Sequence, residues 1–209
     1  MTNHTITILG TGIVGTTLAH GLKQAGYRVT LANRKGTKVE GWHGNVAPYQ
    51  AATAGADVII LAVKGAAAED VVTSLRNELS GKTVIDTTNP ITDDPPDDGV
   101  LQYFTAQNES LMERLQMIAP EANFVKALNS VGNGVMVQPK FTSGPPTMFI
   151  CGDNEAAKQR ASELLTKLGW ESYDMGGVEA ARAIEPLCML WCIPGFRDNS
   201  WNHAFKLLK

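Results

Sequence analysis

The sequence has little that would connect it with nucleic acid, a membrane or secretion. Its 18 basic residues are outnumbered by 21 acidic ones, and the formal net charge of −3 excludes the basic surface that nucleic acid requires. The longest apolar run, VIILAV, is far too short to span a bilayer, and the opening MTNHTITILG lacks the basic and apolar regions of a signal peptide. We therefore expect a cytoplasmic protein with a small-molecule partner, and neither nucleic acid nor a membrane.

Residues that commonly carry chemistry are also few. The three cysteines are odd in number and too clustered for a disulfide framework. Cys188 and Cys192 are spaced to share one face of a helix and could form half of a metal site, but no second Cys or His pair lies near them in the sequence. Buried, reduced thiols are favoured, and we predict no metal. The four histidines are scattered, and no acid/base dyad or nucleophilic triad emerges.

The chain does have a regular alternation of short apolar runs and amphipathic segments. At 209 residues with 44% apolar content, it is long enough for one sizeable domain with a real core. Continuous apolar character predicts strands buried on both faces, as in a parallel sheet. The predicted strands span residues 5–10, 28–33, 44–48, 57–63, 82–90, 123–129, 147–153 and 170–176, and the predicted helices span 13–25, 66–81, 108–120 and 154–169.

This alternation predicts an α/β fold: a Rossmann-type, doubly wound, mostly parallel sheet of about eight strands with a small C-terminal helical portion. We expect residues 1–153 to form a dinucleotide-binding domain. Residues 154–209 would form a smaller C-terminal portion that closes a cleft.

The first predicted strand leads into the motif Gly10-x-Gly12-x-x-Gly15, which opens a helix and is followed by a second strand. The first glycine permits the tight turn, the second lets the backbone approach a pyrophosphate, and the third lets the helix pack closely on the strand. Free backbone N–H groups and the helix dipole then attract the phosphates. Three glycines that serve only a turn remain the alternative.

At the end of the second strand, where an NAD-binding site presents an acid, the sequence has Asn33, Arg34 and Lys35. These cations reverse the electrostatic sign and favour a ribose 2′-phosphate, which Arg34 can bind through charged hydrogen bonds. Lys38 can add a further positive charge. NADP(H) therefore fits better than NAD(H), and a solvated basic turn is the alternative.

Ligands of open α/β sheets bind beyond the carboxyl ends of the strands. Asn89 and Asn129 follow two such ends and suit a nicotinamide carboxamide or a substrate carbonyl, although each could simply cap a turn. Lys64 could contact a ribose or remain a surface cation. The acidic, proline-rich loop 92–99 reads either as a solvated connection or as a mobile rim over a cleft.

Several segments together resemble the NADPH-dependent reductases of the 8-hydroxy-5-deazaflavin coenzyme F-420, the F-420-dependent NADP oxidoreductase family. They include GTGIVGTTLAHGL, DVIILAV, VIDTTNP, VKALN and ARAIEPL, in the same order along nearly the whole chain. The resemblance implies an N-terminal Rossmann domain that binds NADP(H), a C-terminal part that closes the cleft over the deazaflavin, and a homodimer. It also covers members whose acceptor is a flavin or an unknown small molecule, including the reductase domains of metal-reducing membrane proteins.

Carried over residue by residue, the resemblance implies three groups of cofactor-binding residues. The pyrophosphate loop comprises Gly10, Thr11, Gly12, Ile13, Val14 and Gly15, the 2′-phosphate site comprises Asn33, Arg34 and Lys35, and the nicotinamide surround comprises Ala62, Val63, Asn89, Ala127, Leu128 and Asn129, beside the candidate Lys64.

Three functions fit these features. The leading prediction is an NADP-dependent oxidoreductase that transfers hydride between the nicotinamide and a deazaflavin or flavin-like acceptor, because two preformed cofactors need mainly orientation. The alternatives are an NADPH-dependent reductase of a small carbonyl or imine and a non-catalytic NADP(H)-binding sensor.

Overall fold

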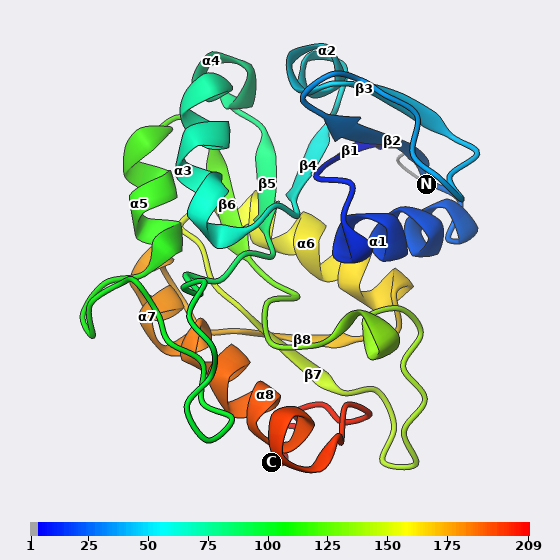
Figure 1. Ribbon diagram of the computed structural model, residues 1–209. Helices are drawn as coiled ribbons and strands as arrows, with labels where there is room; N and C mark the ends of the chain where they lie inside the picture. The colour runs from blue at the N-terminus through cyan, green and yellow to red at the C-terminus, as the bar shows by residue number, and fades with distance from the viewer. Residues whose placement is uncertain (1–3) are drawn as a thin grey trace.

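The computed structural model describes residues 4–209 and contains a six-stranded, fully parallel sheet (Figure 1). The strand order is β3-β2-β1-β4-β5-β6, the doubly wound order of dinucleotide-binding domains. Its strands are β1 (Thr5–Leu9), β2 (Arg28–Asn33), β3 (Asn45–Pro48), β4 (Val58–Leu61), β5 (Thr83–Asp86) and β6 (Asn123–Lys126). The order reverses between β1 and β4, which places the switch point of the sheet beside the glycine motif.

Helices cover both faces of this sheet, as the alternation predicts. One face carries α1 (Ile13–Gln24) and α6 (Glu155–Lys167), and the other carries α2 (Tyr49–Ala54), α3 (Gly65–Ser74), α4 (Arg76–Leu79) and α5 (Leu111–Ile118). The helix predicted over 66–81 is divided at Leu75, whose fully buried side chain lies between α3 and α4. The apolar surface that Leu75 buries at this break favours two short helices over one continuous helix.

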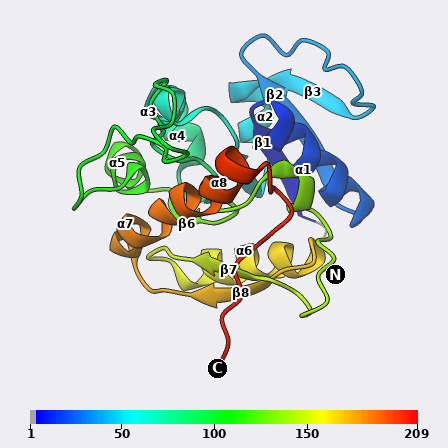
Figure 2. The same ribbon diagram turned by 60° about the horizontal axis from the view of Figure 1, so that its bottom comes forward.

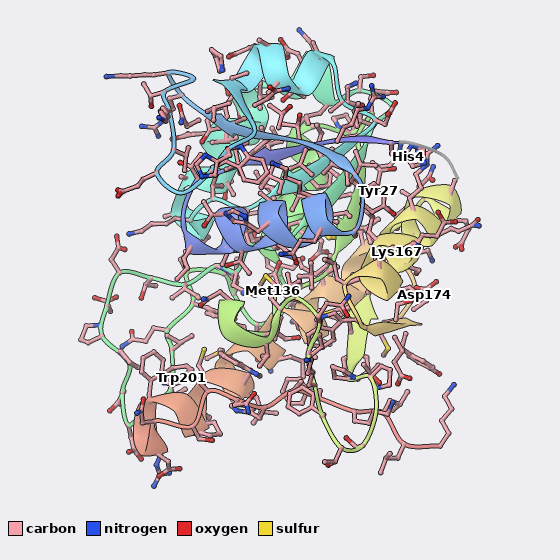
Figure 3. The ribbon with its side chains drawn as sticks, turned by 90° about the vertical axis from the view of Figure 1, so that its right-hand side faces the viewer. His4, Tyr27, Met136, Lys167, Asp174 and Trp201 are labelled. Atoms are coloured by element: carbon pink, nitrogen blue, oxygen red, sulfur yellow. The ribbon has the colours of Figure 1, made fainter. Side chains whose placement is uncertain are left out.

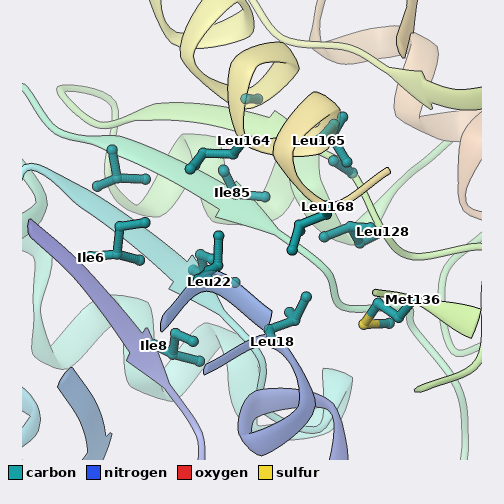
Figure 4. Packing of buried hydrophobic residues seen from close by; sticks show 14 of the residues in the cluster. Ile6, Ile8, Leu18, Leu22, Ile85, Leu128, Met136, Leu164, Leu165 and Leu168 are labelled. Carbon is teal, nitrogen blue, oxygen red and sulfur yellow. The ribbon is translucent and has the colours of Figure 1, made fainter. Parts of the chain in front are cut away.

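The core beneath α1 and α6 shows why the strands read as continuous apolar runs. Figure 4 shows Leu22 of α1 near Ile6 of β1, with Leu164 of α6 and Leu168, just beyond α6, in the same cluster. A second buried cluster fills the opposite face of the sheet, so the central strands have no solvent face.

The fold class is confirmed, but the prediction of one sheet of about eight strands is wrong. Eight strands form within residues 4–209, yet β7 (Thr147–Ile150) and β8 (Glu171–Asp174) make a separate two-stranded parallel sheet. After β6 the chain turns at Leu128, whose φ of 60° is rare for a bulky residue, and leaves the sheet edge. A single antiparallel bridge, Lys126 to Cys151, then connects the two sheets.

The remaining C-terminal segments are η2 (Val178–Ala180), α7 (Ala181–Ile184) and α8 (Pro186–Asp198); η1 (Asn133–Val135) lies earlier in the chain. The boundary predicted after residue 153 falls between β7 and α6, and α6 packs on β5 and β6. Figure 2 brings α8 to the front, and Figure 3 shows Trp201 just beyond its end. Trp191 of α8 packs against Gly132 and thereby joins this helix to the segment after β6.

All three cysteines are free and buried, as the sequence predicts. Burial raises the pKa of the Cys151 thiol to about 12. At pH 8 only about one part in ten thousand of this thiol is ionised, and only the thiolate reacts rapidly.

No helix within residues 4–209 combines the length and apolar character needed to cross a membrane.

We therefore expect Cys151 to alkylate with iodoacetamide at least a hundredfold more slowly in the native protein than in guanidinium-unfolded protein at pH 8. Peptide mass spectrometry over a time course measures this rate for each cysteine separately. Equal rates for Cys151 in the two states would show that the thiol is exposed.

Candidate functional site

A cleft of about 540 Å³ lies at the carboxyl edge of β1, β2 and β4. It joins the glycine turn, the cationic end of β2 and the end of β4 in one space. Nine residues predicted from the sequence line it: Gly10, Thr11, Gly12, Asn33, Arg34, Lys35, Ala62, Val63 and Lys64. A hollow of about 570 Å³ between α5 and the turn at 153–154 contains none of the predicted residues.

The glycine turn has the geometry that a phosphate-binding loop needs. Gly10 has a φ of 119°, and a β-carbon there would collide with the carbonyl oxygen of Ala62. A β-carbon at Gly15 would collide with the carbonyl oxygen of Gly10, whereas Gly12 has open space beside it. No side chain from residues 4–209 caps the first turn of α1, so its N–H groups have no side-chain acceptor where the helix begins beside Gly12 of the cleft. An anion can bind at this helix end.

Asn33 shapes the cationic side of the cleft through its own side chain. Its Oδ1 accepts the backbone N–H groups of Lys35 and Thr37, each at 3.1 Å, and its Nδ2 donates to the Thr37 carbonyl at 2.9 Å. This closed turn holds Arg34 and Lys35 exposed at the edge of the cleft. One amide hydrogen of Asn33 is left for a ligand.

Tyr49, the first residue of α2, also lines the cleft and was not predicted. Burial raises the pKa of its hydroxyl, and the positive charge of Arg34 opposes that shift. The phenol stays neutral near neutral pH and lines the same cleft as Arg34. Three other lining residues that the sequence analysis missed are Thr37, Ala67 and Val71.

On the other side, the predicted nicotinamide residues form a linked pair of amides. Asn89 Nδ2 donates to the Asn129 carbonyl at 2.8 Å, and Asn129 Nδ2 donates to Asn89 Oδ1 at 3.0 Å and to the Ile184 carbonyl at 3.0 Å. Asn129 Oδ1 is buried without a donor from residues 4–209. The amide orientation is fixed, and one strong acceptor is left unused.

The other predicted residues hold this region without lining the cleft: Ile13, Val14, Gly15, Asn89, Ala127, Leu128 and Asn129. The Leu128 N–H donates to the sulfur of Met148 at 3.2 Å, which ties the strained turn to β7. Gly65, at the start of α3, lies against the carbonyl of Asn89, where a β-carbon would collide.

The acidic loop 92–99 runs between the cleft and α8. Asp93 lies 3.6 Å from the Lys64 ammonium, and both side chains are highly exposed. At the far end, Asp98 lies 4.0 Å from Arg197 of α8, and Gly99 contacts the same helix. The loop folds back on itself, because the N–H of Thr92 donates to the carbonyl of Gln102 at 2.9 Å.

Comparison with known proteins agrees with this geometry. Residues 5–90 match the sequence model of the family described as NADP oxidoreductase, coenzyme F420-dependent. An F420-dependent NADP reductase of Methanothermobacter thermautotrophicus is 28% identical over 201 residues, which cover 93% of this chain and 83% of that protein. The predicted family resemblance is confirmed.

Two further relatives share the likeness over most of the chain. The crystal structure of a proposed F420-dependent NADP reductase from Arthrobacter sp. FB24 has a TM-score of 0.89 at 29% identity and covers 99% of this chain and all of that one. Rat metalloreductase STEAP3 is 29% identical over 194 residues, which cover 90% of this chain. The chain spans only 38% of that curated relative's length. These likenesses support the prediction of an NADP-dependent oxidoreductase.

Proposed function

We propose that the protein is an NADP(H)-dependent oxidoreductase that transfers hydride between the nicotinamide and a deazaflavin or flavin-like acceptor. The observation that carries the proposal is the single cleft that joins the uncapped start of α1 to Arg34 and Lys35. One end of this cleft suits a pyrophosphate, and the other suits a ribose 2′-phosphate. The names of two of the relatives, both F420-dependent NADP reductases, support the same assignment.

The nicotinamide would lie at the Ala62–Lys64 end of the cleft, next to the Asn89–Asn129 pair, which lies outside the cleft lining. The mutual hydrogen bonds of Asn89 and Asn129, with the bond from Asn129 to the Ile184 carbonyl, fix the loop ends on this side of the cleft. The bound dinucleotide supplies the hydride, so the protein has to bind, orient and exclude water. Arg34 and Lys35 would hold the 2′-phosphate, Gly12 and the start of α1 would hold the pyrophosphate, and the amide pair would fix the nicotinamide ring.

An acceptor panel tests this function. The protein should oxidise NADPH, followed at 340 nm, with oxidised deazaflavin, FMN, FAD or a ferric chelate, and should use NADH at least tenfold less efficiently, because Arg34 and Lys35 have no phosphate to bind in NADH. The Arg34→Ala variant serves as the matched control for NADPH recognition. Tight NADPH binding without oxidation by any of these acceptors would contradict hydride transfer to a flavin-like acceptor and leave the two alternatives, a reductase of a small carbonyl or imine and a sensor.

A further inference from the structure

A buried ionic cluster lies directly behind the amide pair. Lys126, the last residue of β6, is fully buried, and its ammonium contacts Asp86 Oδ2 at 2.6 Å and Glu185 Oε1 at 2.7 Å. It also donates to the carbonyl of Thr88 at 2.9 Å. An ammonium has three hydrogens, so all of its donors are used.

The two carboxylates hold backbone on the far side of the cluster. Asp86 Oδ1 accepts the N–H and the hydroxyl of Thr88, at 2.9 and 2.7 Å. Glu185 accepts the N–H groups of Leu111 and Met112, at 2.9 and 3.0 Å, in the first turn of α5. The two acids and one base leave one negative charge, which the positive end of α5 offsets. The two carboxylates raise the pKa of Lys126 despite its burial, so it remains charged.

The three segments joined by Lys126 are the segments that position the amide pair. Thr88 directly precedes Asn89, and Lys126 lies three residues before Asn129. Glu185 directly follows Ile184, whose carbonyl accepts a hydrogen bond from Asn129. The Tyr103 hydroxyl also donates to the Glu185 carbonyl at 2.8 Å, which ties the loop after Asn89 to the same point. Movement of the ammonium would therefore move both asparagines.

Stability alone does not account for such a cluster. A buried ion pair is often no more stabilising than apolar residues of the same volume, because desolvation offsets the attraction. What the cluster provides is direction: the three N–H donors of the Lys126 ammonium fix the segment 86–88 and Glu185 relative to the end of β6.

We propose that Lys126 is a positioning residue that sets the nicotinamide-side amides Asn89 and Asn129 for hydride transfer without touching the cofactor. The inference rests on the proposed function. The proposed 2′-phosphate and pyrophosphate sites lie in the cleft, which neither asparagine lines, so Lys126 governs turnover and leaves NADPH affinity unchanged.

The test is the double variant Asp86→Asn/Lys126→Met. The single Lys126→Met change would strand two buried carboxylates, whereas the double change removes one charge of each sign and keeps the cluster's net charge. We expect kcat to fall about ten- to a hundredfold, because small misplacements of reacting groups cost that much. The Kd for NADPH should stay within about twofold of wild type, since the phosphate contacts dominate affinity.

The matched control is Asp174→Asn/Lys158→Met. Lys158 of α6 contacts Asp174 Oδ2 at 2.7 Å and Glu155 at 2.8 Å, and Asp174 Oδ1 accepts the N–H of Gly176, just as Asp86 Oδ1 accepts that of Thr88. Figure 3 shows Asp174 beside α6, away from Trp201 and the end of α8. This control should leave kcat within about twofold of wild type, as expected for a site remote from the cleft.

Fluorescence of bound NADPH gives a readout that does not need turnover, because nicotinamide emission rises when the ring is immobilised. The Asp86→Asn/Lys126→Met variant should lose most of the emission enhancement at saturation, and the control should keep it. Circular dichroism confirms that both variants are folded. Equal kcat and equal emission in the two double variants would overturn the proposal. A different result would separate the two proposals. If the wild-type protein enhances NADPH emission but oxidises no NADPH, the proposed function is wrong. Positioning by Lys126 is still supported in that case if only the Lys126 variant loses the enhancement.

Discussion

Replacement of Arg34 by alanine is expected to raise the Kd for NADPH about ten- to a hundredfold, the loss of roughly 1.5–3 kcal/mol that accompanies removal of charged hydrogen bonds. Arg34 and Lys35 lie at the exposed edge of the cleft, on the turn that Asn33 closes. The Kd for NADH should change less than about twofold, because its ribose carries no 2′-phosphate for Arg34 to bind. Titration calorimetry with both nucleotides measures the difference.

The matched control for this prediction is Lys38→Ala. It removes the same charge four positions later, from an exposed residue outside the lining of the cleft. If each side chain acts only through long-range attraction, Arg34→Ala and Lys38→Ala should weaken NADPH binding about equally. In 0.5 M salt, which screens such attraction, both variants should then bind NADPH as the wild-type protein does. An unchanged Kd for NADPH in Arg34→Ala would show that Arg34 does not read the phosphate.

Gly12→Ala should abolish most nucleotide binding while the fold stays intact. The φ of −74° at Gly12 is accessible to alanine, and a β-carbon there meets no atom of residues 4–209 within 4 Å. The added methyl group instead occupies the space where a pyrophosphate approaches the backbone. Loss of hydrogen bonds to a charged diphosphate should raise the Kd for NADPH about a hundredfold or more.

Gly15→Ala separates this effect from a general disruption of the turn. Its β-carbon would collide with the carbonyl of Gly10, so it should destabilise the protein by about 1–3 kcal/mol, the usual cost of overpacking. Thermal unfolding should show a lowered Tm for Gly15→Ala and an unchanged Tm for Gly12→Ala. Wild-type NADPH affinity in Gly12→Ala would place the pyrophosphate elsewhere.

Local pattern explains how much of the fold the sequence predicted. Each strand is a short apolar run, and burial of both sheet faces makes these runs visible without knowledge of their neighbours. Pairing is not local, so nothing in TMFI or ESYD indicates that β7 and β8 leave the main sheet and pair with each other. The chain leaves the main sheet at Leu128, and this left-handed position carries a leucine, whereas a glycine there would have indicated a turn.

The candidate site divides in the same way. Residues inside or beside a motif, such as Gly12 and Arg34, were predicted and do line one cleft. Tyr49 reaches that cleft from α2 and belongs to no motif. Lys126 and Glu185 lie within VKALN and ARAIEPL, which carry the family resemblance, but the sequence does not indicate their contact, because a buried ion pair leaves no periodic pattern.

The contact between Lys126 and Glu185 makes the segments VKALN and ARAIEPL depend on each other. If a chimaera took its C-terminal helices from a relative with a neutral residue in place of Glu185, Lys126 would face Asp86 alone and the first turn of α5 would lose its acceptor. Among homologues, residues 86, 126 and 185 should therefore change together or not at all. Segments exchanged between this chain and its relatives should keep their function only when all three residues come from the same parent.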